Sequence, residues 1–307
     1  MKIIKEKLSN KALYMISITT CIVCFAVLIA YLVNIYSYEN KSMIGKPELF
    51  VEGIISPQGI AFNRDGRLFV QSNWDGKISI ISKDGTAMDY SYIEKHYGYG
   101  MDIDYSYNFT MASMQQVTVY DNSGNVLRSI NGFNNAYDVV KGPGNLIFVS
   151  DSATNNIYRI SQENEVTLFA ELGEHKSSDE PNATGICFDK DYRNLYVANM
   201  YKGDLYKISL SKNFEFERID IIASNLQKPN FIDIDEQGNV FITCIGDNTI
   251  VRVNQNSVKE LVDTKGKVMS PSGIAISDNN GNVLYVGSKD NNSVYKINIG
   301  TMNQTKK

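Results

Sequence analysis

Six related short segments recur along this 307-residue chain, and their repetition constrains the fold more than any other feature. The segments are PQGIAF (57–62), YGMDI (99–103), AYDVV (136–140), TGICF (184–188), NFIDI (230–234) and SGIAI (272–276). Measured between corresponding residues, successive segments lie 41, 37, 48, 46 and 42 positions apart. Repeats of this length are typical of the blades of a β-propeller.

Each segment is followed by turns and further β-rich runs. A turn rich in Gly, Asn and Asp leads to a second run, another tight turn leads to a third, and most repeats add a more variable fourth. Short runs joined by Asp-Gly, Asp-Asn or Asn-Asn pairs predict antiparallel hairpins. We therefore expect an all-β fold, a six-bladed β-propeller with four-stranded antiparallel blades, over residues 47–300.

The two ends of this region are expected to meet. The sixth repeat ends near Gly300 without a fourth run, and the run ELFVEGI (48–54) belongs to no repeat. Pairing these two would close the ring and remove an exposed sheet edge. We therefore predict that the N-terminal strand completes the last blade and that residues 301–307 form a tail.

A long apolar segment precedes the repeats. The 22 residues 12–33 contain no charged side chain, and as a helix they would extend about 33 Å, enough for a hydrocarbon core of about 30 Å. Four lysines and one glutamate lie in residues 1–11, so the positive-inside rule predicts a cytoplasmic leader. We expect a single-pass signal anchor at 12–36 in the cell membrane, a stalk at 37–46 and an extracytoplasmic propeller. A cleaved signal peptide is the alternative.

Charge and cysteine usage exclude some functions. The formal charge is −4 overall and −7 without the basic leader, which argues against nucleic-acid partners. Cys187 and Cys244 follow the membrane segment, and two cysteines are too few for a disulfide-held secreted fold. We expect both to be buried packing residues.

Two families have similar repeats. The stretches GNVFITCIGDNTIVRVN (238–254) and GNLIFVSDSATNNIYRIS (144–161) resemble NHL repeats. The first unit, SPQGIAFNRDGRLFVQSNWDGKISIISKDG (56–85), is similar to blades of the senescence-marker protein, gluconolactonase and luciferin-regenerating enzyme family. These resemblances imply a six-bladed propeller, and the second implies a lactonase, ester hydrolase or lyase as one functional alternative.

The gluconolactonase resemblance also implies a divalent cation, calcium or zinc, at the tunnel mouth. Its ligands would be a Glu, two Asn and an Asp at the heads of inner strands, an oxygen set that suits a hard cation. These positions fall on Pro57, Ala136, Thr184 and Asn230, so one plausible oxygen ligand remains. Nearby alternatives come from a polar insertion at 173–182. The candidate metal ligands are Asn182, Asn230 and Glu180.

Other chemistry has little support. The chain has two histidines, His96 and His175, too few for a three-histidine zinc site, and it lacks a G-x-S-x-G elbow and a P-loop. We therefore expect a binding module that holds a protein, glycan or small molecule on its loop face, without a confidently assigned cofactor. The candidate ligand contacts are polar residues at the heads of inner strands and aromatic residues in second turns: Gln58, Thr184, Asn230, Ser272, Trp74 and Tyr201.

Overall fold

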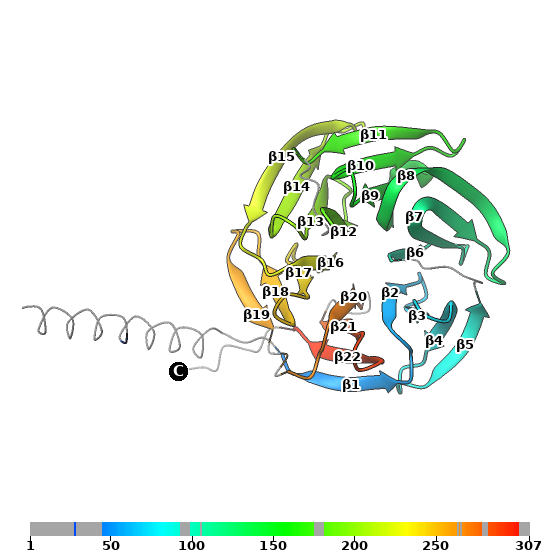
Figure 1. Cartoon of the computed structure of the whole chain (residues 1–307), viewed down its shortest axis with the longest axis vertical. Helices are drawn as coiled ribbons and strands as arrows, with labels where there is room; N and C mark the ends of the chain where they lie inside the picture. Colours follow the sequence, from blue (N-terminus) through cyan, green and yellow to red (C-terminus); the bar gives the residue numbers. More distant parts are fainter. Residues whose placement is uncertain are drawn as a thin grey trace, which may run out of the picture. The chain divides into compact units, whose positions relative to one another are not determined.

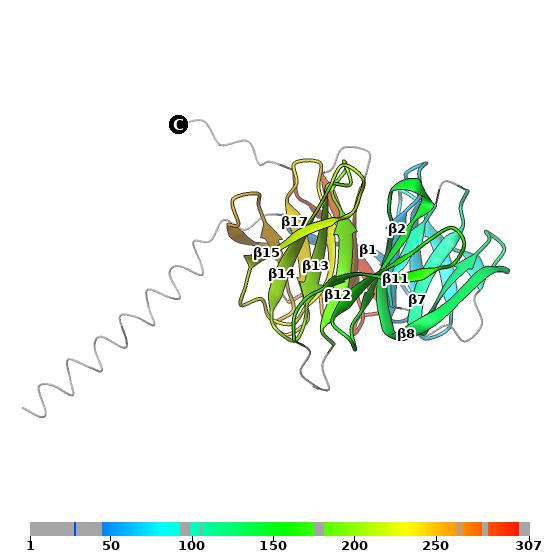
Figure 2. The same cartoon turned by 90° about the horizontal axis from the view of Figure 1, so that it is seen from above.

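The computed structural model of the chain describes residues 28, 45–92, 99–104, 106–174, 181–262, 264, 266–277 and 282–300. The chain divides into two compact units, residues 1–42 and 43–307. The second unit is a β-propeller, a ring of sheets around a central axis (Figure 1). The strands of this unit run from one face of the ring to the other (Figure 2).

The strands nearest the axis coincide with the six recurring segments. Neighbouring inner strands contact one another around the ring. They are β2 (Pro57–Phe62), β6 (Met101–Ile103), the C-terminal part of β8 (Val126–Lys141), β12 (Ala183–Phe188), β16 (Pro229–Ile234) and β20 (Pro271–Ile276).

The remaining strands follow outward in each sheet. Intermediate strands are β3 (Leu68–Ser72), β4 (Lys77–Ile81), β7 (Phe109–Tyr120), β9 (Ile147–Asp151), β10 (Asn156–Ile160), β13 (Asn194–Asn199), β14 (Asp204–Leu210), β17 (Val240–Cys244), β18 (Thr249–Val253), β21 (Val283–Ser288) and β22 (Ser293–Asn298). Outermost are β1 (Pro47–Glu52), β5 (Ala87–Tyr92), β11 (Val166–Glu171), β15 (Phe216–Ala223) and β19 (Lys259–Val262). A short 3-10 helix, η1 (Pro143–Asn145), precedes β9.

The prediction of six four-stranded blades is wrong. The described strands form five sheets, four with four strands and one with six, in the order β11-β10-β9-β8-β7-β6. The reason is the length of β8, which runs without a break through residues 126–130, the fourth run of the second repeat, and the predicted inner segment 136–140. Gly132, at φ +118°, and three register shifts against the neighbouring strands let this strand bend between its outer and inner positions.

Closure of the ring is confirmed. β1 pairs antiparallel with β22, with Pro47 opposite Ile297 and Glu52 opposite Ser293. The sheet order β1-β22-β21-β20 places this N-terminal strand at the outer edge of the last sheet. Strands from the two ends of the propeller thus share one sheet, which protects the edge of β22.

Two kinds of turn define the two faces of the ring. The first-turn face carries the turns after inner strands, such as 63–67, 189–193 and 235–239, and the second-turn face carries turns such as 73–76 and 200–203. Aspartate side chains organise the first turns: Asp235 Oδ1 accepts bonds from the main-chain N–H groups of Gln237 (3.0 Å) and Asn239 (2.8 Å). Such Asx turns explain why Asp and Asn punctuate the sequence.

Inner strands approach one another closely. A Cβ atom added to Gly185 on β12 would lie 2.5 Å from the carbonyl oxygen of Asn230 on β16, and one added to Gly273 on β20 would collide with that of Gln58 on β2. Glycine therefore recurs in these segments because a larger residue would push neighbouring strands apart.

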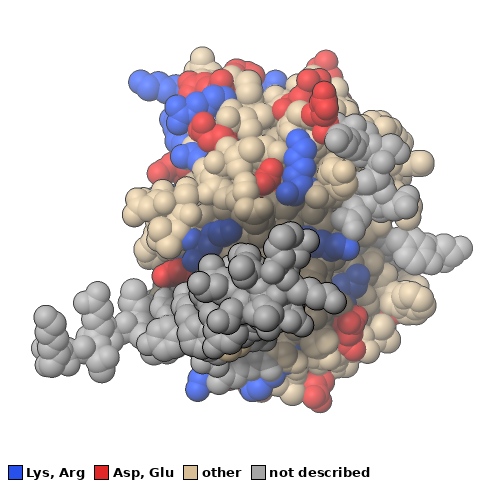
Figure 3. Space-filling model, turned by 60° about the vertical axis from the view of Figure 1, so that its left-hand side comes forward, with Lys and Arg blue, Asp and Glu red and all other residues tan. Residues whose placement is uncertain are grey.

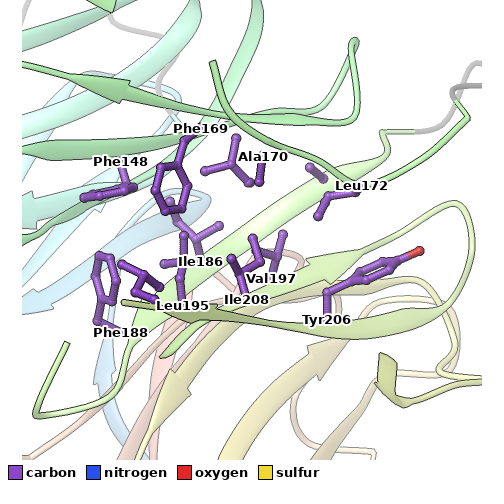
Figure 4. Packing of buried hydrophobic residues seen from close by; sticks show 13 residues of the cluster. Phe148, Phe169, Ala170, Leu172, Ile186, Phe188, Leu195, Val197, Tyr206 and Ile208 are labelled. Atoms are coloured by element: carbon purple, nitrogen blue, oxygen red, sulfur yellow. The ribbon is translucent and has the colours of Figure 1, made fainter. Parts of the chain in front are cut away.

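The core lies between neighbouring sheets. In one cluster, Phe148 on β9 contacts Phe169 on β11 and Phe188 on β12 edge-to-face, at ring-centroid distances of 4.9 and 5.0 Å. Figure 4 shows Phe148 and Phe169 beside Phe188 and Leu195 of the next sheet. Ile208 of that sheet belongs to the same cluster. Burial of such side chains supplies the main driving force for holding adjacent sheets together.

The predicted leader, membrane span and tail lie outside the described residues, apart from Leu28, as does most of the stalk. Within the described part of the chain, no helix is long and apolar enough to cross a membrane. The single-pass topology therefore stays a prediction. Cys187 and Cys244 are both described, and both are free and buried, as expected.

Acidic and basic side chains are interspersed on the outer surface. On the face shown in Figure 3, Lys and Arg lie beside Asp and Glu rather than in patches of one sign. One such contact joins Arg159 on β10 to Glu215, at 3.1 Å. Exposed pairs of this kind add about 0–1 kcal/mol each, so the buried groups near the axis are the better guide to function.

Candidate functional site

The predicted polar ring lies buried at the second-turn end of the inner strands. Gln58, Thr184, Asn230 and Ser272 are each at most 4% exposed. Their polar atoms already have partners: Gln58 Oε1 accepts a bond from Asn73 Nδ2 (2.8 Å), and the Thr184 hydroxyl can donate to the carbonyl of Ala198 or Pro229, both at 3.2 Å. The ring thus joins strands together.

Tyr137, rather than Ala136, occupies this ring in the third repeat. A register shift in the β8–β9 pairing places Ala136 opposite Asp151, as Ala183 lies opposite Asn199, so the sequence alignment was wrong by one residue. The Tyr137 hydroxyl donates to Asn230 Oδ1 (2.7 Å), and burial raises its pKa. Its ring stacks on Tyr99 at 4.6 Å with an interplanar angle of 4°. Aromatic side chains therefore fill this end of the axis.

The described residues here do not fit the metal that the fold family implies. Asn230 Oδ1 already accepts the bond from the Tyr137 hydroxyl, and Asn182 is 1% exposed and uses its amide nitrogen to bond the carbonyl of Ser152 (3.2 Å). Glu180 lies outside the described residues. Across the described ranges, no group of three or more His, Cys, Asp or Glu side chains could hold a metal ion.

The two aromatic candidates lie on the second-turn face. The side chain of Trp74 is 77% exposed and that of Tyr201 is 39% exposed. Both residues lie in the turn after the second strand of their repeat, as the sequence predicted. Their role as ligand contacts stays a prediction.

A cavity of about 200 Å³ lies on the axis, nearer the first-turn face. Its walls are largely aliphatic, with Ile60, Val139 and Ile186 among them, and they include the thiol-bearing Cys187. Three carboxylates also line it, Asp102 from β6, Asp138 from β8 and Asp233 from β16. The cavity therefore combines apolar walls with convergent charged groups.

Each of these carboxylates bonds its strand to the next inner strand. Asp102 Oδ2 accepts from the main-chain N–H of Lys141 (2.7 Å), Asp138 Oδ2 from that of Ile186 (2.9 Å) and Asp233 Oδ2 from that of Ile276 (2.7 Å). The other oxygen of each accepts from the following residue on its own strand, Ile103, Val139 or Ile234.

Burial controls the protonation of the carboxylates. Desolvation raises the pKa of Asp138 to about 8, against two main-chain hydrogen bonds that lower it, and the charges of Asp102 and Asp233 raise it further. Burial likewise raises the pKa of Asp102. Among the described residues lining this cavity there is no Lys, Arg or His. The carboxylates therefore lack a neighbouring cation inside the cavity.

A second cavity of about 680 Å³ lies at the first-turn face and shares Phe62, Asp102, Val140, Cys187 and Asp233 with the first. It is therefore the mouth of the axial cavity. Unlike the deeper part, the mouth has basic residues in its walls: Arg64, Arg128, Lys141 and Lys190.

Two of these cations lie close together. Arg128 is held by Asn164 Oδ1 (2.6 Å) and the carbonyl of Ser161 (3.0 Å). Burial lowers the pKa of the Lys141 ammonium. The negative charges of Asp102 and Asp104 oppose this shift, and the positive charge of Arg128 adds to it. The Lys141 ammonium makes no hydrogen bond or ion pair with the described residues, so its donors remain available.

The sequence contained a signal for this cavity that the repeat alignment did not use. Aspartate interrupts three of the six inner segments, YGMDI, AYDVV and NFIDI, at positions surrounded by aliphatic residues. A carboxylate in an otherwise buried strand is costly and thus worth weighing. The basic residues of the mouth had no such signal, because they are scattered along the sequence between positions 64 and 190.

A family model described as "Repeat of unknown function (DUF6923)" matches residues 136–306, more than half of the chain. The chain belongs to the DUF6923 family. None of the curated proteins matches this DUF6923 chain.

Solved structures show the same fold as the DUF6923 chain. A gluconolactonase from Xanthomonas campestris has 12% identity and a TM-score of 0.68, covering 82% of this chain and 88% of its own. Regucalcin from Agrobacterium tumefaciens, described as a calcium-binding protein, has 12% identity and a TM-score of 0.64, covering 84% and 96%. Virginiamycin B lyase from Staphylococcus aureus has 18% identity and a TM-score of 0.58, covering 78% and 79%. The predicted resemblance to gluconolactonase-like propellers is confirmed for the fold.

Proposed function

We propose that this DUF6923 propeller is a binding module that takes a small polar ligand into its axial cavity from the first-turn face. One observation carries the proposal: three carboxylates line a cavity whose described walls contain no basic residue. Ligand pockets are typically concave and mostly apolar, with a few convergent polar groups.

The hydrogen bonds that the aspartates make between inner strands do not explain why acidic residues stand at these positions. Strand pairing places Ala61, Cys187 and Ala275 at the position that Asp102 and Asp233 occupy in their own repeats. The inner strands that carry these uncharged residues still contact the next inner strand around the ring. Since the ring is built without a carboxylate at these places, the cost of burying Asp102 and Asp233 favours a further role for these two side chains.

Filling the cavity tests this proposal. Ala275 is 4% exposed and lines the cavity, so Ala275→Met would occupy part of its volume with a flexible side chain. Ala87, exposed at the start of β5, gives the matched control Ala87→Met. Small polar compounds would be screened by calorimetry against the purified full-length protein.

The expected result is that Ala275→Met weakens binding about tenfold or more, while Ala87→Met leaves it unchanged. The melting temperature of both variants would be recorded to confirm that they are folded. Compounds that bind both variants as tightly as the wild type would show that their site lies elsewhere.

The second candidate function is a lactonase, ester hydrolase or lyase. It is favoured by the pKa of Asp138, about 8, because a carboxyl that titrates near neutral pH can give and take a proton during a reaction. Gluconolactonase and lyase structures share this fold. A panel of lactones and esters would test it: turnover should fall at least a hundredfold in Asp138→Asn, and a panel that is not turned over at all argues against the enzyme.

A further inference from the structure

We infer that the ligand is zwitterionic, with a protonated amine that enters the axial cavity and a carboxylate that stays at its mouth. The inference rests on the proposed function and narrows it to a class of ligand. It follows from the separation of charge along the axis. The deeper cavity has three carboxylates and no basic residue in its described walls, whereas the mouth adds four basic residues, Arg64, Arg128, Lys141 and Lys190, beside Asp104 and Asp189.

The deeper cavity has acceptors left for an ammonium group. The two oxygens of Asp138 accept one main-chain hydrogen bond each, and those of Asp102 do the same. A carboxylate oxygen can accept a second bond, and an alkylammonium has three donors. A cation here would also favour the ionised form of Asp138, whose pKa is raised to about 8 by burial and by the charges of Asp102 and Asp233.

The mouth has donors left for an anion. The Lys141 ammonium is half-buried and has no acceptor among the described residues. Arg128 lies near enough to lower the pKa of Lys141 and is fixed in place by Asn164 and Ser161. A ligand carboxylate between the two cations would give Lys141 a partner and reduce their repulsion.

The spacing sets the size of the ligand. Asp138 and Lys141 lie three positions apart on β8, and an extended strand rises roughly 3.3 Å per residue, or about 10 Å in all. An extended ω-amino acid of moderate length carries its two charges a comparable distance apart. Charge and spacing together favour such a molecule over a simple amine or a simple acid.

Four compounds with the same carbon chain test the inference on the purified full-length protein. They are 6-aminohexanoate with both charges, hexylamine with the positive charge, hexanoate with the negative charge and hexanamide with neither. Calorimetry should show that 6-aminohexanoate binds at least about tenfold more tightly than each of the others. Equal or tighter binding of hexylamine or hexanoate overturns the inference, as does binding of none of the four.

A variant of Lys141 tests whether the carboxylate of the ligand binds at the mouth of the cavity. Lys141→Met should weaken binding of 6-aminohexanoate about tenfold and leave that of hexylamine unchanged. Lys207→Met is the matched control, since Lys207 is also half-buried but lines a different groove. If the affinity falls only in the control, or in neither variant, Lys141 does not bind the carboxylate of the ligand.

The outcomes also separate this inference from the proposed function. If another compound of the set binds most tightly and Ala275→Met weakens that binding, the cavity is a ligand site but the zwitterion is wrong. If no compound of the set or of the wider screen loses affinity in Ala275→Met, the proposed function itself fails.

Discussion

The Asp138 carboxylate on β8 accepts a 2.9 Å hydrogen bond from the main-chain N–H of Ile186 on β12, and so joins two inner strands at the wall of the axial cavity. The same carboxyl is buried beside Asp102 and Asp233, which makes its charged form costly. One residue therefore connects the stability of the ring with the electrostatics of the candidate site.

The first prediction concerns pH and stability. The pKa of Asp138 rises from 3.8 to about 8 on folding, so between these values the native protein binds more protons than the unfolded chain. Its contribution to stability is fully present below pH 3.8 and is lost as the pH rises through about 8. Denaturant unfolding at a series of pH values should show a free energy of unfolding that decreases over this range, with a shallower decrease in Asp138→Asn.

The variant also has an expected cost at low pH. An amide at position 138 turns one acceptor oxygen into a donor, so the N–H of Ile186 or Val139 loses its partner. Asp138→Asn should therefore be less stable than the wild type by about 1–3 kcal/mol near pH 5, and the gap should narrow toward pH 9. Parallel stability profiles for the two proteins would show that Asp138 does not titrate as described.

The second prediction concerns Gly100. A Cβ atom at this position would collide with the Asp138 carboxyl and lie 2.7 Å from the Asp138 Cα. Gly100→Ala should lower the free energy of unfolding by about 1–3 kcal/mol. Adding Asp138→Ser, whose side chain is shorter, should restore part of that loss, and a double-mutant cycle measures the coupling. Strictly additive effects would mean that the two sites do not clash.

The third prediction concerns the aromatic stack. Tyr137→Phe removes the donor to Asn230 Oδ1 and should cost about 1–3 kcal/mol, since that oxygen is buried. Tyr99→Phe keeps the stack and disrupts no hydrogen bond among the described residues, so its stability should change by less than about 0.5 kcal/mol. Thermal unfolding of the pair is the measurement, and equal losses would contradict the assigned hydrogen bond.

The fourth prediction concerns closure of the ring. Val51 on β1 is 5% exposed and lies opposite Val294 on β22, whereas Leu49 on the same strand is 48% exposed. Val51→Asp should cost more than about 3 kcal/mol because it buries an unpaired charge. Leu49→Asp should cost about 0.5 kcal/mol or less. Similar losses in both would mean that β1 does not close the propeller.

Much of the fold could be predicted because it depends on local patterns. The run TGICF lies within β12, and ELFVEGI became the closing strand. The six-stranded sheet could not be predicted. Residues 131–135 are rich in Asn and Gly and resemble a turn, but they lie inside β8, where Gly132 allows a bend instead of a chain reversal. The same irregular region shifted the alignment of Ala136 and Tyr137 by one residue.

The site was harder to predict than the fold because it depends on which way side chains point and on which face the cavity opens. Gln58 and Ser272 were correctly placed at the heads of inner strands, but their polar atoms are used within the protein. Lys141 and Arg128 lie near opposite ends of β8 and yet interact, which spacing alone does not reveal.

The most direct test of the account is a crystal structure of the protein with the tightest-binding compound from the screen. The account predicts ligand density in the axial cavity, in contact with Asp102, Asp138 and Asp233, reached from the first-turn face. Density on the second-turn face around Trp74 and Tyr201, with the axial cavity unchanged, would contradict it.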